Sequence, residues 1–126
     1  MTEHVKVSVD NGVMEITWNR PEKKNAITNA MYKAVGDALD KASADKAVRV
    51  VLFTSEGDSF SAGNDLSVFA AANSGVAAEP PQGHRLIHTL AKFEKPIVAG
   101  VRGVAIGVGA TMLLHCDLVY VATDAK

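Results

Sequence analysis

The sequence has little of what disulfide, cysteine-metal or nucleic-acid chemistry requires. Its 126 residues include one cysteine, Cys116, which excludes an internal disulfide and a metal site built from cysteines. A single cysteine also fits a reducing compartment. Charge of one sign is not in excess, because the formal net charge is −1. A near-neutral chain lacks the basic surface that binding to nucleic acid requires, so we expect no nucleic-acid partner.

Long apolar runs and a leader segment are also missing. The most apolar stretch, Ile97 to Ala122, is interrupted by charged residues and four glycines, whereas a membrane-spanning helix needs about 20 predominantly apolar residues. The first residues, Met1 to His4, show no basic region followed by an apolar run, so no signal peptide is predicted. We therefore expect a cytoplasmic protein with no membrane partner.

Three common catalytic and nucleotide-binding motifs are absent. A G-x-G begins at Gly107, but Met112 stands where a dinucleotide-binding fingerprint has its third glycine. No G-K-[ST] is present for a phosphate-binding P-loop, and no G-x-S-x-G is present for a serine hydrolase.

What is present favours one globular α/β domain. The length suits a single domain, and 48% apolar residues with almost no net charge argue against global disorder. Alternating patterns around Asn11-Gly12 predict a β-hairpin, and Thr28 is positioned to cap a helix reaching about Ala44. The remaining predicted elements are strands at 48–54, 97–101 and 118–122, a short helix near residue 65, a loop over 73–83, and helices around 86–93 and 108–115. The strand at 48–54 is expected to be buried on both faces.

Two glycine-containing turns each follow a predicted strand and precede a predicted helix. They are Phe60–Leu66 and Gly100–Thr111. The first N–H groups of a helix have no partner inside it, and glycine lets a ligand approach the backbone closely. Two such turns could direct two N–H groups at one oxygen, as the stabilisation of an enolate or a tetrahedral oxyanion requires. Tight packing of strand against helix also needs small residues, so that alternative stays open.

Four stretches together resemble the enoyl-CoA hydratase/isomerase (crotonase) superfamily. They are Asn19-Arg20-Pro21 with Lys24-Asn25-Ala26-Ile27, Phe60 to Leu66, Lys95 to Gly100 with Gly103, and Gly107 to Asp117. Their order and spacing agree with the family along the whole chain. The resemblance implies an α/β crotonase-like fold built as a ββα superhelix, of which residues 1–126 would form the N-terminal core. It also implies an acyl-CoA thioester as the substrate.

The resemblance also carries site residues. It implies that the backbone N–H groups of Asn64 and Val108 bind the thioester oxygen, so these two positions are the candidate catalytic groups. The residues it places along the CoA and acyl path are Lys24, Ala26, Ala62, Gly63, Asn64, Asp65, Leu66, Gly107, Val108 and Thr111. Coenzyme A would enter as part of the substrate, with no separate cofactor and no metal. A homo-oligomer, a trimer or a hexamer, is expected on the same ground.

The sequence departs from the family pattern at two points. Thr111 occupies the position where hydratases of the family carry a glutamate, which favours members that work with one carboxylate, such as double-bond isomerases. Family domains are also longer, and the second catalytic carboxylate is expected beyond the position of Lys126. The resemblance thus implies an enoyl-CoA hydratase/isomerase-type enzyme that acts on an acyl-CoA thioester and stabilises an enolate, which is the function we favour. The alternatives are a double-bond isomerase, a thioester hydrolase, a dehalogenase, or an acyl-CoA-binding chain without turnover.

Several residues that could carry chemistry have simpler structural interpretations. We expect His84 and His88 on a solvated helix face, Cys116 as a small buried apolar residue, and Trp18 in the core. Asp65 is expected to cap the short helix that follows it, in preference to acting as a base.

Overall fold

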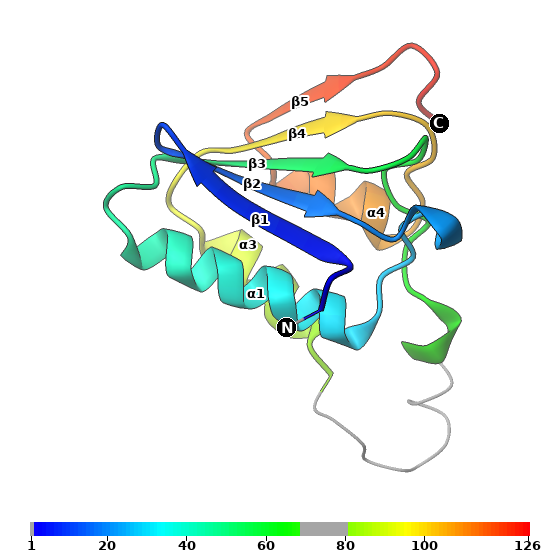
Figure 1. Cartoon of the computed structure of the whole chain (residues 1–126), viewed down its shortest axis with the longest axis horizontal. Coiled ribbons are helices and arrows are strands. Elements are labelled where there is room, and N and C mark those ends of the chain that lie inside the picture. The colour runs from blue at the N-terminus through cyan, green and yellow to red at the C-terminus, as the bar shows by residue number, and fades with distance from the viewer. Residues whose placement is uncertain (1, 69–80) are drawn as a thin grey trace.

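A computed structural model of the chain, describing residues 2–68 and 81–126, contains one five-stranded sheet whose strands lie in chain order (Figure 1). The strands are β1 (Val5–Asp10), β2 (Val13–Trp18), β3 (Val50–Ser55), β4 (Ile97–Val101) and β5 (Leu118–Val121). β1 pairs antiparallel with β2, and β2 to β5 are all parallel. Parallel neighbours need helical crossovers, which fits the predicted α/β architecture.

The predicted hairpin at Asn11-Gly12 is confirmed. Asn11 and Gly12 have φ values of 50° and 81°, which Asn and Gly adopt more readily than other residues. The register pairs Asp10 with Val13, so the turn has two residues. Trp18 at the end of β2 is fully buried, as predicted, and stacks on Phe53 with ring centroids 6.4 Å apart.

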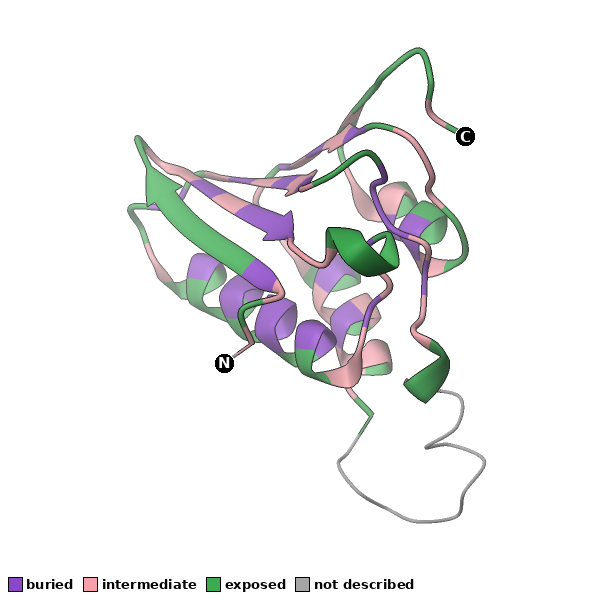
Figure 2. Ribbon diagram, turned by 45° about the vertical axis from the view of Figure 1, so that its right-hand side comes forward, coloured by how far each residue is buried: buried purple, intermediate pink, exposed green. Residues whose placement is uncertain are grey.

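Helix α1 (Asn29–Ala44) forms as predicted, and its apolar face covers the sheet (Figure 2). The Thr28 hydroxyl accepts a hydrogen bond from the Met31 amide, which satisfies one of the free donors at the helix start. Helix α3 (Gly83–Lys92) packs beside α1 and buries Leu86 and Leu90. None of the helices among the described residues is both long and apolar enough to span a membrane.

Three sequence predictions need correction or fall outside the described residues. Only one face of β3 is fully buried, because α1 and α3 cover a single side of the sheet; Val51, Phe53 and Ser55 are buried and the residues between them are half-buried. The helix predicted at 108–115 divides into α4 (Val108–Thr111) and a 3-10 turn, η2 (Met112–His115). The loop predicted over 73–83 ends earlier, because α3 begins at Gly83, and its residues 73–80 are not among those described.

The parallel arrangement determines where a site can form. Because β2 to β5 run in the same direction, their carboxyl ends share one edge of the sheet. The loops that follow β3 and β4, which contain the two glycine turns, both leave from this edge (Figure 1). In open α/β sheets this is the edge where ligands bind.

Candidate active site

The two glycine turns lie side by side in the structure. Ser61 and Ala105 form an isolated parallel bridge. The Ser61 amide donates to the Val104 carbonyl at 3.0 Å, and the Ile106 amide donates to the Ser61 carbonyl at 3.0 Å. This short backbone pairing fixes the loop after β3 against the loop after β4, a few residues before the predicted donors Asn64 and Val108.

Three glycines permit this close approach. A Cβ atom would lie 2.7 Å from the Ile106 carbonyl oxygen at Gly63, 2.6 Å from the Ser61 carbonyl oxygen at Gly109, and 1.8 Å from the Asp58 carbonyl oxygen at Gly103. These glycines therefore let one loop pack against the other, whereas the alternative drawn from the sequence was packing of strand against helix. Gly107 differs, because a Cβ there would meet only the Gly63 Cα at 3.9 Å. Its φ of 59° is what favours glycine at that position.

The Asn64 amide makes no hydrogen bond within residues 2–68 and 81–126. Its neighbours on both sides are bonded to Ile27: the Ile27 amide donates to the Gly63 carbonyl at 2.8 Å, and the Asp65 amide donates to the Ile27 carbonyl at 2.9 Å. Alternate residues of an extended segment direct their amides to opposite sides, so the Asn64 N–H is directed away from Ile27.

The Val108 amide likewise has no acceptor within the part of the chain that the structure describes. Val108 is the first residue of α4, where a helix leaves its N–H groups unpaired. The next three amides are bonded, Gly109 to the Ile106 carbonyl and both Ala110 and Thr111 to the Gly107 carbonyl. Both predicted donors are thus unpaired, on loops that touch.

Asn25 fixes the loop after β3, which we call the first loop, through hydrogen bonds to its main chain and to the Ser61 side chain. The sequence did not predict this role. This buried residue accepts a hydrogen bond from the Arg20 amide at 2.7 Å and donates to the carbonyls of Glu56 and Ser59 at 2.9 and 2.8 Å. Its own carbonyl accepts from the Ser61 hydroxyl at 2.9 Å. The motif around Lys24–Ile27 thereby fastens the loop that carries Asn64.

Asp65 caps the helical turn that follows it, as the sequence predicted, and it also forms an ion pair with Arg20. Its carboxylate accepts from the Ser67 amide at 2.9 Å and lies 2.6 Å from the Arg20 guanidinium. These hydrogen bonds, from Ser67 and then from Arg20, hold the pKa of the Asp65 carboxyl well below its usual range. A carboxylate so firmly ionised is a poor proton acceptor.

The other predicted binding residues surround the two loops. The Lys24 side chain is exposed, and its carbonyl accepts from the Ala62 amide at 2.9 Å. Ala26 is half-buried, and Thr111 lies exposed on α4. Large apolar side chains also lie open to solvent near the loops, with Leu66 81% and Ile106 56% exposed. An apolar acyl chain would find contact surface there.

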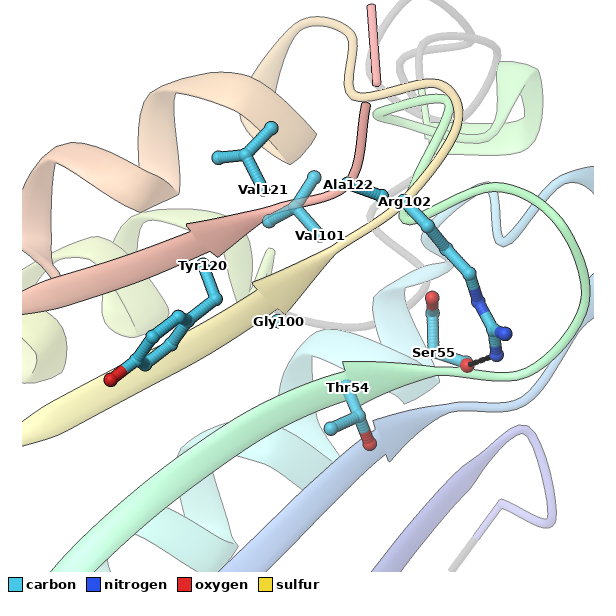
Figure 3. Close-up of a pocket in the computed structure, with 8 residues that line it drawn as sticks. All are labelled: Thr54, Ser55, Gly100, Val101, Arg102, Tyr120, Val121 and Ala122. Carbon is cyan, nitrogen blue, oxygen red and sulfur yellow. Dashed lines mark hydrogen bonds between the residues drawn. The ribbon is translucent and has the colours of Figure 1, made fainter. Parts of the chain in front are cut away.

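A separate open pocket of about 460 Å³ lies at the carboxyl ends of β3, β4 and β5 (Figure 3). The Arg102 guanidinium borders it and donates to the Ser55 carbonyl at 2.8 Å. None of the residues predicted for the site lines this pocket, so we do not assign the thioester chemistry to it.

Two histidines and the one cysteine are the other candidate reactive side chains that the structure describes. His84 and His88 are exposed on α3, as predicted. Cys116 is half-buried, in place of the full burial that was expected. Burial and the neighbouring Asp117 raise its pKa to about 11, so the thiol stays protonated near neutral pH. Among the described residues, no group of three His, Cys, Asp or Glu side chains is arranged to hold a metal ion.

Comparisons with known proteins point to one family. The sequence profile of the enoyl-CoA hydratase/isomerase family matches residues 8–126. Enoyl-CoA delta isomerase 2 of Rattus norvegicus is 40% identical in an alignment of 125 positions that covers 96% of this chain and 32% of that protein. The 4-chlorobenzoyl coenzyme A dehalogenase-1 of an Arthrobacter species is 36% identical in an alignment of 126 positions that covers 96% of this chain and 45% of that protein.

A solved structure agrees with these sequence relatives. The crystal structure of an enoyl-CoA hydratase/isomerase from Pseudoalteromonas atlantica T6c matches with a TM-score of 0.87 and 42% sequence identity. The match covers 98% of this chain and 48% of that one. The chain thus spans less than half of the length of each of these three relatives.

Proposed function

Because this chain belongs to the enoyl-CoA hydratase/isomerase family and has its crotonase fold, we propose that its two loops bind the thioester carbonyl oxygen of an acyl-CoA and stabilise the enolate formed from it. The donors are the backbone N–H groups of Asn64 and Val108. Bonding between the loops supports this assignment, and so does the fact that neither amide donates a hydrogen bond to any residue that the structure describes.

The chemistry explains why two fixed backbone donors are useful. When a proton leaves the carbon beside a thioester carbonyl, the electron pair moves onto the carbonyl oxygen. Donors already in place strengthen their hydrogen bonds as this negative charge grows, and losing one such donor costs on the order of 10²–10³ in rate. Backbone donors need no particular side chain, so Asn and Val at these positions are compatible with the role.

Among the family reactions, we favour a shift of the double bond. In that reaction a base takes a proton from the carbon beside the carbonyl, and the resulting dienolate regains a proton two carbons further along. Thr111, in place of the glutamate expected in hydratases, supports isomerisation, and so does the similarity to the rat isomerase. Asp65 is unsuited to be the base because hydrogen bonds from Ser67 and Arg20 lower the basicity of its carboxylate, and the family resemblance places the proton-transfer carboxylate beyond the position of Lys126.

A second candidate reaction is dehalogenation of an aromatic acyl-CoA. The 36% identity to the Arthrobacter dehalogenase supports it. It would need the same oxygen site, because attack on the ring of a benzoyl thioester also moves negative charge onto the carbonyl oxygen.

We further propose that Lys24 contacts the phosphate end of CoA as a point charge, and that the chain assembles as a homo-oligomer.

Protection against thermal unfolding tests the proposed binding. A ligand that binds only the folded state raises stability, by about 2.7 kcal/mol at 100 times its Kd. We expect crotonyl-CoA to raise the Tm of the wild-type chain more than CoA does. Val108→Pro removes the donor, yet the first position of a helix tolerates proline and no hydrogen bond within the described residues is lost.

The matched control is Val108→Ala, which shortens the side chain and keeps the N–H. We expect Val108→Ala to retain the extra protection by crotonyl-CoA and Val108→Pro to lose it. Equal protection of both variants would remove Val108 from the site. No protection of the wild-type chain by crotonyl-CoA or CoA would reject the proposed function.

A further inference from the structure

We propose that Tyr32 is a positioning residue for the thioester site, holding the Asn64 main chain so that its amide faces the substrate oxygen. The inference rests on the proposed function and adds to it a residue that acts through Asn64 and is not one of the two donors. Tyr32 lies in the first turns of α1, far along the chain from the loop that carries Asn64.

The contact itself joins a buried phenol to the donor residue. The Tyr32 hydroxyl donates a hydrogen bond to the Asn64 side-chain oxygen, Oδ1. The Tyr32 side chain is buried, at 3% exposure. A Cβ atom at Gly83, the first residue of α3, would lie 3.7 Å from its ring. The ring is therefore held between α1 and the start of α3, and its hydroxyl is directed to the first loop.

This bond completes the fixation of Asn64. Ile27 already holds the carbonyl before it and the amide after it, at 2.8 and 2.9 Å. Those two bonds fix the main chain on either side, and the bond to Tyr32 restrains rotation of the side chain and of the peptide to which it is attached. The main-chain N–H of Asn64 is thereby preorganised, which is the property that makes such donors effective.

The state of the phenol suits this role. Burial raises the pKa of Tyr32 to about 12, so the hydroxyl remains protonated near neutral pH and can only serve Asn64 as a donor. Phenylalanine would fill the same space without that donor. Asn64 is half-buried, so without the Tyr32 hydroxyl its side-chain oxygen would turn toward water, and Asn64 would then be free to rotate.

The test reads oxyanion stabilisation directly and does not require turnover. Acetoacetyl-CoA loses a proton from the carbon between its two carbonyls to give an enolate, whose ultraviolet absorbance reports how much of the bound ligand is in that form. Donors on the thioester oxygen favour the enolate. CoA alone has no acyl carbonyl, so its affinity reports the rest of the binding surface.

Five variants separate positioning from general structure. Tyr32→Phe removes only the hydroxyl, and Asn64→Ala removes the carboxamide but keeps the main-chain N–H. The double variant closes the cycle. Tyr120→Phe is the matched control, because Tyr120 is the only other tyrosine of the chain, is 64% exposed and lies outside the site. Val108→Pro reports loss of the second donor.

We expect Tyr32→Phe to lower the enolate-to-neutral ratio of bound acetoacetyl-CoA about three- to tenfold and to leave CoA affinity within about twofold. Asn64→Ala should give the same loss, and the double variant no more than Asn64→Ala alone. An unchanged ratio in Tyr32→Phe, or additive losses in the double variant, would overturn the role of Tyr32. If Val108→Pro still lowered the ratio in that case, the proposed function would stand. A wild-type chain that binds no enolate would overturn both.

Discussion

At the scale of single residues, the positions of the Asn64 and Val108 amides depend on side chains that are not themselves donors to the thioester oxygen of the proposed substrate. Asp65 is one of them. Its ion pair with Arg20 connects the first loop to the segment after β2, and both side chains are mostly buried. Its bond to the Ser67 amide starts the helical turn that follows. Removing the negative charge of Asp65 should lower the stability of the first loop and leave the hydrogen bond from the Ser67 amide in place.

Asp65→Asn tests this with a defined pH dependence. Asparagine can still accept from the Ser67 amide but cannot pair as an anion with Arg20, so we expect a loss of about 1–3 kcal/mol in the free energy of unfolding near neutral pH. The folded-state pKa of Asp65 is depressed, so its contribution is present above the unfolded value of about 3.9 and is lost as the pH falls toward the folded-state pKa.

Urea unfolding of the wild-type chain and of Asp65→Asn at about pH 6 and about pH 3 measures this dependence. The stability difference should be larger at the higher pH and should shrink at the lower one. A difference that stays constant, or grows in acid, would show that the ion pair does not stabilise the fold.

Sequence reasoning identified the local roles of residues and missed the long-range ones. Thr28 and Asp65 cap the helices directly after them, so their roles follow from position alone. The partners of Asn25 are Glu56 and Ser59, and the partner of Tyr32 is Asn64. No periodicity or motif spacing within one element indicates which distant carbonyl or amide a buried polar side chain will meet.

At the scale of elements, glycine is required at some positions of β4 and its loop and not at others. The difference can be measured as the loss of unfolding free energy when each glycine is replaced by alanine. Gly103 has a φ of 63°, and a Cβ there would overlap the Asp58 carbonyl oxygen. Gly100, three residues earlier in β4, has no atom within 4 Å of a Cβ position. The two glycines thus form a matched pair on one strand and its loop.

We expect Gly103→Ala to lose about 3 kcal/mol or more of unfolding free energy, because both the backbone conformation and the contact between loops would have to change. Gly100→Ala should stay within about 1 kcal/mol of the wild-type chain. Urea unfolding of the two variants measures both values. Similar losses in both would contradict the loop contact at Gly103.

The elements themselves were largely predictable, because their signals are local. The turn at Asn11-Gly12, the cap at Thr28 and the helix end before Pro96 all lie where the sequence places them. Other features depend on packing. The ammonium of Lys95 donates to the carbonyls of Ala42, Asp45 and Val48 at 2.6 to 2.8 Å. That contact joins the end of α1 to the start of β4, and a local pattern cannot indicate it.

At the scale of the whole molecule, the resemblance gave the fold, and the topology explains the position of the site. Parallel strands β2 to β5 bring both glycine turns to one edge. The bridge between Ser61 and Ala105 sets which residues of the two turns lie opposite each other. This register cannot be predicted from the spacing of residues along the chain. The roles of Asn64 and Val108, the cytoplasmic location and the oligomeric state remain predictions.

The helices of the described residues cover one side of the sheet, and β5 lies at its edge (Figure 2). Leu118, Tyr120 and Val121 of β5 are between 49% and 64% exposed. Exposed apolar side chains at a sheet edge are typical of surfaces that pack against further protein.

The most direct measurement of the central claim is the infrared carbonyl stretch of crotonyl-CoA labelled with ¹³C at the thioester carbon and bound to this chain. Two hydrogen bonds to one oxygen polarise the carbonyl and lower its frequency. We expect a lower frequency for the ligand bound to the wild-type chain and to Val108→Ala than for the free ligand, and a smaller shift in Val108→Pro. A bound ligand whose carbonyl absorbs at the frequency found in water, or a shift that Val108→Pro leaves unchanged, would contradict it.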